Sequence, residues 1–373
     1  MNKKVALLTF HNAANYGAVL QTYALQRYLE TIGVYGEYIN YENISRKQMY
    51  DMGYLFRESL SNREFIRAAK YLLGSMFMRK RQQEFKNFVK NYINVTSEIY
   101  TCSDQAKQLN GKYDYFIVGS DMVWNPINNG EDFAYLLDFV EDNEKKISYS
   151  PSFGIAEIPQ NLLPKYKECI TSIKALATRE RAGVQFIKNL TGRDAIQNLD
   201  PVFLLSAEEW KKLEMNQFSE KYVFTYTNSP GQFERFLKTT NFKMEGYKEY
   251  ILSSSTKPGD FLNPNKKVKF SISPNDFLSI IDDANLIVTA SFHCIAFAII
   301  FHKPFVAVLL GDSGQDERLV NLLKVTGLTN RILTDNLSLE EVYKPIDYEE
   351  VDKKLGVFIE DSKRFLNNSI FGE

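Results

Sequence analysis

The chain has 373 residues, of which 44% are hydrophobic and 24% are charged, and a formal net charge of −1. This length allows two domains, and the near-neutral charge argues against a dedicated nucleic-acid binder, which would be strongly basic. The three cysteines (Cys102, Cys169 and Cys294) are odd in number and far apart, so they indicate neither a disulfide framework nor a metal site and favour a reducing compartment. No apolar run approaches the roughly 20 residues of a membrane span, and we expect a cytoplasmic protein.

The N-terminal segment predicts a β-α-β unit. Strand, helix and strand patterns follow one another over residues 4–10, 18–32 and 37–41. The polar break after the first strand contains His11, Asn15 and Tyr16 and matches neither the GxGxxG nor the P-loop pattern. This argues against NAD, FAD and P-loop nucleotide binding, although the break lies where a parallel sheet presents its ligand groups.

A basic helical insert is predicted at about residues 45–100. Residues 54–90 within it contain nine Lys and Arg against three Glu, with many aromatic side chains. A basic helix with exposed apolar groups can lie on an anionic membrane, so one interpretation is a peripheral contact with the inner membrane surface. The alternative is a helical excursion that packs on its own domain.

A polar loop follows the strand pattern of residues 113–119 and contains Asp121, Trp124 and Asn125. A carboxylate beside an indole is typical of a sugar site, because the carboxylate accepts hydrogen bonds from hydroxyl groups and the ring offers a flat face. The alternative is a turn in which Asp121 only caps a helix. Residues 146–154 predict another strand and a loop rich in Ser, Pro and Gly.

The second half of the chain shows the same α/β pattern. Strand patterns occur at residues 173–177, 222–227, 250–253, 286–290 and 305–310. Arg179 follows the first of these, and a guanidinium suits bidentate binding of phosphate or carboxylate. We predict domains at residues 1–172 and 173–345, a linker near 160–175, and a helical tail at 346–373.

Residues 286–305 predict a buried strand, a polar break and an apolar helix that ends at Lys303 and Pro304. The break holds Ser291 and His293, the latter one of three histidines in the chain. Unpaired N–H groups and the dipole at a helix start favour an anion, which makes both residues candidate anion ligands. The alternative is that Ser291 only caps the helix and that His293 is a satisfied polar group.

Seven segments, taken together and in order, resemble the polysaccharide pyruvyl transferase family. They are residues 8–21, 115–126, 147–154, 178–183, 199–205, 289–297 and 303–305, and the resemblance is weakest at 45–100. The resemblance implies an α/β fold with two Rossmann-like domains facing each other across a cleft, the GT-B-like arrangement. It also implies that the carboxyvinyl group of phosphoenolpyruvate is moved onto a sugar diol of a bacterial capsule, exopolysaccharide or lipid-linked precursor, giving a cyclic pyruvate ketal.

The resemblance implies donor ligands at two places. These are an arginine after a strand of the second domain and an Arg-x-His motif at a strand–helix junction, which correspond here to Arg179 and to Ser291–His293. The histidine is kept, but serine stands where the family pattern has arginine. Either Ser291 and the helix N-terminus substitute for this arginine, or Lys303 or Arg318 supplies the missing positive charge.

Ketal formation needs a base for the sugar hydroxyl, an acid for the methylene carbon of phosphoenolpyruvate, and positive charge for its phosphate and carboxylate. We hypothesise that Arg179 and His293 bind the donor, that His293 is also the acid, and that Asp121 or His11 is the base. The expected acceptor contacts are His11, Asn15, Tyr16, Asp121, Trp124 and Asn125. We expect no cofactor or metal; the partners are phosphoenolpyruvate and a glycan.

Two other functions remain open from the sequence. A nucleotide-sugar glycosyltransferase can share the GT-B architecture, because a fold does not fix a function. The absence of a convincing nucleotide-diphosphate clamp with a ribose-binding carboxylate argues against it. A non-catalytic partner in glycan assembly could also retain the fold.

Overall fold

The chain forms two compact units in the computed structural model, which describes residues 3–43, 52–62, 64–155, 157–227, 231–252, 258–269, 272–311 and 313–372. The first unit is Met1–Leu204 with Ile359–Glu373, and the second is Leu205–Phe358. This division corrects the predicted boundary after residue 172. The segment that follows residue 172 joins the first sheet, because Ala175 forms a parallel bridge to Ile147.

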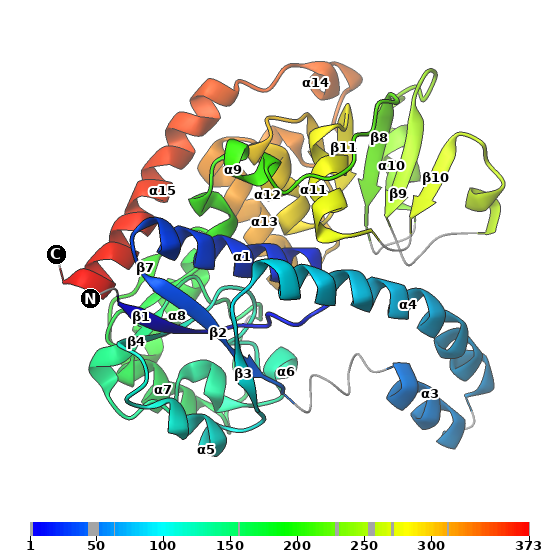
Figure 1. Ribbon diagram of the computed structural model, residues 1–373. Coiled ribbons are helices and arrows are strands. Elements are labelled where there is room, and N and C mark those ends of the chain that lie inside the picture. Colours follow the sequence, from blue (N-terminus) through cyan, green and yellow to red (C-terminus); the bar gives the residue numbers. More distant parts are fainter. Residues whose placement is uncertain are drawn as a thin grey trace. The chain divides into compact units, whose positions relative to one another are not determined.

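The first unit is built on a five-stranded parallel sheet with the order β3-β2-β1-β4-β5 (Figure 1). Its strands are β1 (Lys4–Leu8), β2 (Tyr35–Tyr41), β3 (Val95–Tyr100), β4 (Tyr115–Val118) and β5 (Lys146–Ser148), and a small parallel pair is β6 (Ala177–Thr178) and β7 (Ile196–Gln197). Its helices are α1 (Tyr16–Thr31), α3 (Met52–Ser61), α4 (Phe65–Tyr92), α5 (Ser103–Ala106), α6 (Pro126–Asn129), α7 (Leu163–Ser172) and α8 (Arg181–Thr191). β1 is the central strand, in keeping with its apolar sequence, because a parallel sheet buries both faces of such a strand.

The second unit has the same strand topology with a different sequence. Its parallel sheet has the order β10-β9-β8-β11-β12 (Figure 1). The strands are β8 (Tyr222–Tyr226), β9 (Lys248–Leu252), β10 (Lys266–Lys269), β11 (Leu286–Thr289) and β12 (Phe305–Ala307). The helices are α9 (Ala207–Lys211), α10 (Gln232–Thr240), α11 (Pro274–Asp282), α12 (Phe292–Ile300), α13 (Ser313–Thr326) and α14 (Leu339–Tyr343). The predicted parallel α/β architecture is confirmed for both units.

The predicted linker near residues 160–175 is occupied by helix α7. Its buried side chains Tyr166, Cys169 and Ile170 belong to the core of the first unit. Their spacing of three and four residues places them on one helix face, with lysine and glutamate on the other. The predicted linker is therefore wrong for these residues.

The predicted tail at residues 346–373 is helix α15 (Tyr348–Phe371), whose two ends belong to different units. In the second unit, the Tyr348 hydroxyl donates to the carbonyl of Lys303 at 2.5 Å. In the first unit, the Ser362 hydroxyl accepts from the amide of Leu199 at 3.0 Å. The tail is therefore a structural part of both units rather than an appendage.

The predicted basic insert contains the helices α3 and α4, as expected. Residues 95–100 of the insert form β3 instead, which pairs with β2. Residues 45–51 and 63 lie outside the described residues, as do the side chains of residues 52, 53, 55 and 66–78. Among the described residues, no helix combines the length and the apolar character that crossing a bilayer requires.

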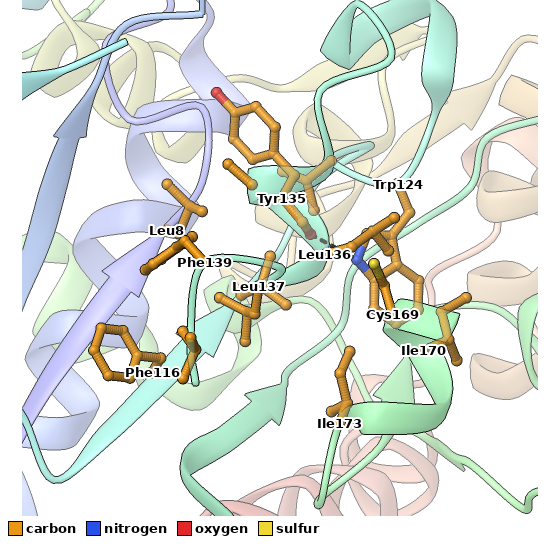
Figure 2. Packing of buried hydrophobic residues seen from close by; sticks show 14 of the residues in the cluster. Leu8, Phe116, Trp124, Tyr135, Leu136, Leu137, Phe139, Cys169, Ile170 and Ile173 are labelled. Carbon is orange, nitrogen blue, oxygen red and sulfur yellow. Dashed lines mark hydrogen bonds between the residues drawn. The ribbon is translucent and has the colours of Figure 1, made fainter. Parts of the chain in front are cut away.

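Trp124 lies inside the core of the first unit (Figure 2). Its side chain is 0% exposed, and the indole N–H donates to the carbonyl of Tyr135 at 2.9 Å. The carbonyl of Trp124 accepts from the Tyr166 hydroxyl at 3.0 Å. This corrects the expectation of an indole platform for a sugar, because core packing already covers the ring and a backbone carbonyl already satisfies its N–H.

We predict that Trp124→Ala lowers the free energy of unfolding by about 3–5 kcal/mol, because it leaves a large cavity in this core. Thermal unfolding followed by circular dichroism measures the effect. The matched control is Ile127→Ala, three residues further on and 65% exposed, which should leave the transition almost unchanged. Equal transitions for the two variants would contradict a core position for Trp124.

Candidate active site

Most candidate residues of the first unit lie at the carboxyl ends of its strands. The strand order reverses direction between β1 and β4, and parallel sheets bind ligands outside the carboxyl ends at such a switch point. The loops after β4, β5 and β6 are joined there by backbone hydrogen bonds. The Ser152 amide donates to the carbonyl of Asp121 at 2.8 Å, and the Arg179 amide donates to the carbonyl of Pro151 at 3.1 Å.

An ion pair is buried at this edge. Nη1 of Arg179 donates to Oδ2 of Asp200 at 2.6 Å, and the two side chains are 3% and 0% exposed. The hydroxyl of Ser120 donates to the same carboxylate oxygen at 3.3 Å, and the Val202 amide donates to Oδ1 at 3.2 Å. Buried charges require such partners, since their desolvation is otherwise unfavourable. The sequence did not identify Asp200 as a candidate site residue. The only sequence feature that pointed to it was the Asn-Leu-Asp-Pro turn after β7.

Negative charge exceeds positive charge around Arg179. Oδ1 of Asp121 lies 4.0 Å from Nη2 of Arg179, and the buried Glu180 accepts from the Ser152 hydroxyl at 2.9 Å. Burial by itself lowers the pKa of Arg179, but the charges of Asp200, Asp121 and Glu180 outweigh burial and raise the pKa. The guanidinium is thus already engaged by neighbouring carboxylates. In this geometry Arg179 positions carboxylates, and its role as a ligand of an anionic donor stays a prediction.

A buried glutamine connects the carboxyl ends of β1 and β4. Nε2 of Gln21, in α1, donates to the hydroxyl of Thr9 at 3.2 Å, and its Oε1 accepts from the amide of Ser120 at 3.3 Å. The Thr9 hydroxyl donates to the carbonyl of Ser120 at 2.9 Å. These bonds fix the spacing of the two strand ends that border the switch point. Gln21 was not among the predicted site residues. The feature that could have identified it is a polar side chain within a helix that is otherwise mostly buried.

Asp121 retains a reachable carboxylate, since its side chain is 15% exposed. Its φ is 71°, in the left-handed region that non-glycine residues seldom occupy, and a parallel bridge to Pro151 restrains it there. Oδ1 accepts from the amide of Met122 at 2.8 Å. The following helix α6 is capped by Asn125, so the helix-cap alternative for Asp121 does not hold. Asp121 is a loop carboxylate held at the switch point.

Three other expected acceptor contacts have structural roles. Oδ1 of Asn15 caps α1 by accepting from the Ala18 amide at 3.1 Å, and Asn125 caps α6 in the same way. Tyr16 is buried, with its ring centroid 4.9 Å from that of Phe85. Of these three residues only Asn15 is exposed, so only its amide is available to a ligand. The expectation that Tyr16 and Asn125 contact an acceptor is corrected by their burial.

His11 lies in the loop after β1 and is 2% exposed. Its Nδ1 is 3.4 Å from the carbonyl of Thr9, and its ring stacks on Tyr38 at a centroid distance of 6.1 Å. Burial lowers the pKa of His11 from 6.5 to about 4, so the ring is neutral at neutral pH. A neutral imidazole can accept a proton, but its burial keeps a sugar hydroxyl away. Asp121 is therefore the better supported base.

In the second unit, the switch point lies between β8 and β11, and Ser291 and His293 follow β11 there. Oγ of Ser291 accepts from the amide of Cys294 at 3.4 Å, and the Ser291 amide donates to Oγ1 of Thr289 at 3.0 Å. The helix-cap interpretation of Ser291 is thus confirmed. His293 is the second residue of α12, and its buried ring lies 5.1 Å from that of Phe292. A capped helix start still offers N–H groups and a favourable dipole to an anion.

Lys303 lies at the opposite edge of the second sheet. Helix α12 runs from the carboxyl end of β11 to the amino end of β12, and its 9 residues span about 14 Å. Nζ of Lys303 lies 3.9 Å from Oδ1 of Asp282, the last residue of α11. Lys303 therefore cannot join Ser291 and His293 in one clamp, which corrects its expected role.

Arg318, in the second turn of α13, follows β12 from the carboxyl edge, and α13 packs against α12.

Arg179 and His293 belong to different units, which corrects the expectation that both follow strands of one sheet. Arg179 follows β6, and β6 attaches beside β5 of the first sheet. The Ser148 hydroxyl of β5 donates to the carbonyl of Ala177 in β6 at 2.9 Å. A strand pattern in the sequence does not tell which sheet the strand joins, and this local contact decides it.

We predict that Asp200→Ala lowers the free energy of unfolding by about 3–5 kcal/mol, because it leaves the guanidinium of Arg179 buried without its 2.6 Å partner. Replacing both partners with apolar residues, as Arg179→Met with Asp200→Leu, should be less destabilising than Asp200→Ala alone. The control is Glu168→Ala, which removes an exposed ion pair with Lys165 and should cost less than about 1 kcal/mol. Urea unfolding measures all three; a double variant that is at least as destabilised as Asp200→Ala would contradict a coupled pair.

A second prediction concerns pH. The pKa of His11 is 6.5 when unfolded and about 4 when folded, so the unfolded state binds more protons in this interval. Stability is retained above pH 6.5 and is lost as the pH falls through the interval, by about 3 kcal/mol at pH 4. His11→Asn should remove this part of the acid destabilisation. Parallel stability–pH curves for the protein and the variant would contradict a buried neutral His11.

Comparison of the chain with known proteins identifies its family. The family model described as polysaccharide pyruvyl transferase matches residues 15–312. Among solved structures, the chain is similar to UDP-GlcNAc 2-epimerase from Methanocaldococcus jannaschii, with a TM-score of 0.53, 11% sequence identity, and 96% of this chain and 93% of that chain covered. It is also similar to S. aureus MnaA in a co-structure with UDP, with a TM-score of 0.51, 10% identity, and 100% and 98% covered. No curated protein matches the chain.

At these low identities the structural similarity shows the fold alone, and it confirms the predicted GT-B-like class of two Rossmann-like units. The family match spans most of the 373 residues, including both switch points with Asp121 and His293. The protein therefore belongs to the polysaccharide pyruvyl transferase family and is a transferase enzyme.

Proposed function

We propose that the protein transfers the carboxyvinyl group of phosphoenolpyruvate to two hydroxyl groups of a sugar in a surface polysaccharide or its lipid-linked precursor. The methylene carbon is protonated, one hydroxyl oxygen adds to C2, the bond from C2 to the phosphate oxygen breaks, and the second hydroxyl oxygen adds to C2. One hydroxyl proton ends on the new methyl group and the other on the released phosphate. The family match over residues 15–312 carries this proposal.

The donor is assigned to the carboxyl edge of the second unit. A phosphate or carboxylate there would meet the N–H groups at the start of α12, where the helix dipole is favourable. His293 is the second residue of that helix, and its imidazole is assigned as the acid for the methylene carbon, since histidine is the side chain that most often transfers protons in catalysis. Arg318 is assigned to the phosphate, because α13 packs against α12 and starts from the same edge.

The acceptor is assigned to the carboxyl edge of the first unit. Asp121 is the candidate base, because its carboxylate is the partly exposed one among the acids around Arg179. Arg179 is a positioning residue that compensates the charges of Asp121 and Asp200. Asn15, which is exposed in the loop after β1, is the candidate hydrogen-bond partner of a sugar hydroxyl.

We predict that His293→Gln lowers kcat/KM by about 10²–10⁴, the range of general acid–base catalysis, because glutamine retains polarity without an acidic proton. Phosphate release from phosphoenolpyruvate, in the presence of a galactoside-type acceptor, measures the rate. Lys303→Gln is the matched control at the opposite edge of the same sheet and should stay within about twofold of the parent, since Lys303 is outside the site. Circular dichroism checks that both variants fold.

The methyl resonance of the product separates ketal formation from simple hydrolysis of phosphoenolpyruvate. A new ketal methyl signal that requires the acceptor supports the proposal. Turnover of a nucleotide sugar, with no phosphate release from phosphoenolpyruvate over a panel of glycan acceptors, would replace it with the glycosyltransferase alternative. Absence of both activities in the folded protein would favour the non-catalytic role in glycan assembly.

A further inference from the structure

The last part of helix α4, residues 79–91, has an outward face without acidic or apolar side chains. Every exposed residue in this range is Arg, Lys, Gln or Asn, and we call this set the basic face of α4. It consists of Arg79, Lys80, Gln82, Gln83, Lys86, Asn87, Lys90 and Asn91. Four of these eight side chains are cationic. The chain as a whole has a net charge of −1, so the concentration of positive charge here is local.

The cations form a stripe along the helix. Lys86 and Lys90 follow Arg79 by 7 and 11 residues, which are close to two and three full helical turns. The three side chains therefore leave the helix in nearly the same direction. Gln83 and Asn87 lie beside them and hydrogen-bond to each other at 2.8 Å. A straight line of cations on one helix face fits an extended, flat array of negative charge.

The opposite face of the same segment holds α4 to the first unit. Phe85 and Phe88 are buried, with ring contacts to Tyr16 at 4.9 Å and to Tyr23 at 6.2 Å. Nε of Arg81 donates to the carbonyl of Ala14 at 3.1 Å. Figure 1 shows this end of α4 running beside α1. The inner face is thus fully engaged, and the basic face is oriented away from the body of its unit.

We propose that the basic face of α4 docks on an anionic phospholipid bilayer. Phosphate headgroups complement the cations, and a bilayer presents them on the flat surface that a straight stripe matches. A glycan chain is less suited, because it binds to grooves with exposed aromatic rings, and the aromatic residues Phe85 and Phe88 face inward. The inference rests on the surface of α4 alone and does not depend on the proposed catalytic function.

Vesicle flotation of the intact protein tests this inference. We expect binding to vesicles that contain phosphatidylglycerol, weak binding to pure phosphatidylcholine, and loss of binding at high salt, because exposed charges are screened. The triple variant Arg79→Gln, Lys86→Gln, Lys90→Gln should bind anionic vesicles at least about tenfold more weakly, since each surface cation contributes to lipid affinity. The matched control, Lys353→Gln, Lys354→Gln, Arg364→Gln, removes the same charge from exposed positions of α15 and should bind as the parent does.

Three results would overturn the inference. They are equal binding to neutral and anionic vesicles, an undiminished triple variant, and a loss of binding in the α15 control as large as in the triple variant. A parallel measurement with dextran sulfate and with a DNA duplex identifies the partner class: binding of either in solution without binding to anionic vesicles would assign the stripe to a soluble polyanion and reject the bilayer. Phosphate release by each variant, measured separately, distinguishes failure of this inference from failure of the proposed reaction.

Discussion

The buried ion pair between Arg179 and Asp200 is the interaction on which the carboxyl edge of the first unit depends. It joins the segments after β6 and β7, and through Ser120 and Asp121 it extends to the segment after β4. Such a pair contributes little net stability, because desolvation offsets most of the attraction, but either partner left alone is strongly unfavourable. The pair therefore disfavours any structure of this edge in which the segment after β6 or the segment after β7 is displaced. Beside this pair, the parallel bridge to Pro151 restrains Asp121 in its left-handed backbone conformation.

The two units show how one topology yields two different sites. Both sheets follow the same order, and in each the fourth strand of that order ends in a candidate residue: Asp121 after β4 and His293 after β11. The sequences at these equivalent positions differ in kind. The first is a loop with carboxylates and a single compensated arginine, and the second is a helix start that offers N–H groups. The first edge is therefore rich in negative charge, whereas the second offers hydrogen-bond donors, and the proposed reaction uses this difference in its assignment of acceptor and donor.

The sequence predicted the parallel α/β architecture and the buried strands, because such strands are continuous apolar runs. It missed β3, β7 and β10, of which β3 and β10 are edge strands with largely exposed or half-buried residues. It predicted the candidate site less well. Trp124 and Asn125 have the residue types of a sugar site, but the tryptophan fills the core and the asparagine caps α6. Asp200 and Gln21 were missed, because a buried polar residue is recognised by its partners, and these come from segments far apart in the chain. The domain boundary was misplaced for a similar reason, since only the tertiary contact of Ala175 assigns its segment to the first unit.

Ser291 determines how the second unit can bind an anion. The resemblance to the family led us to expect arginine at this position, whereas serine caps α12 and contributes about 1 kcal/mol to helix stability. An arginine side chain could not make that cap. Serine at this position therefore stabilises the start of α12 but provides no positive charge. The N–H groups and dipole of α12 remain, but they carry only about half an elementary charge. In the proposed reaction, a full positive charge for phosphoenolpyruvate would therefore come from a neighbouring element. Lys303 lies at the amino edge, whereas Arg318 belongs to the adjacent helix α13, so the proposed reaction assigns this charge to Arg318.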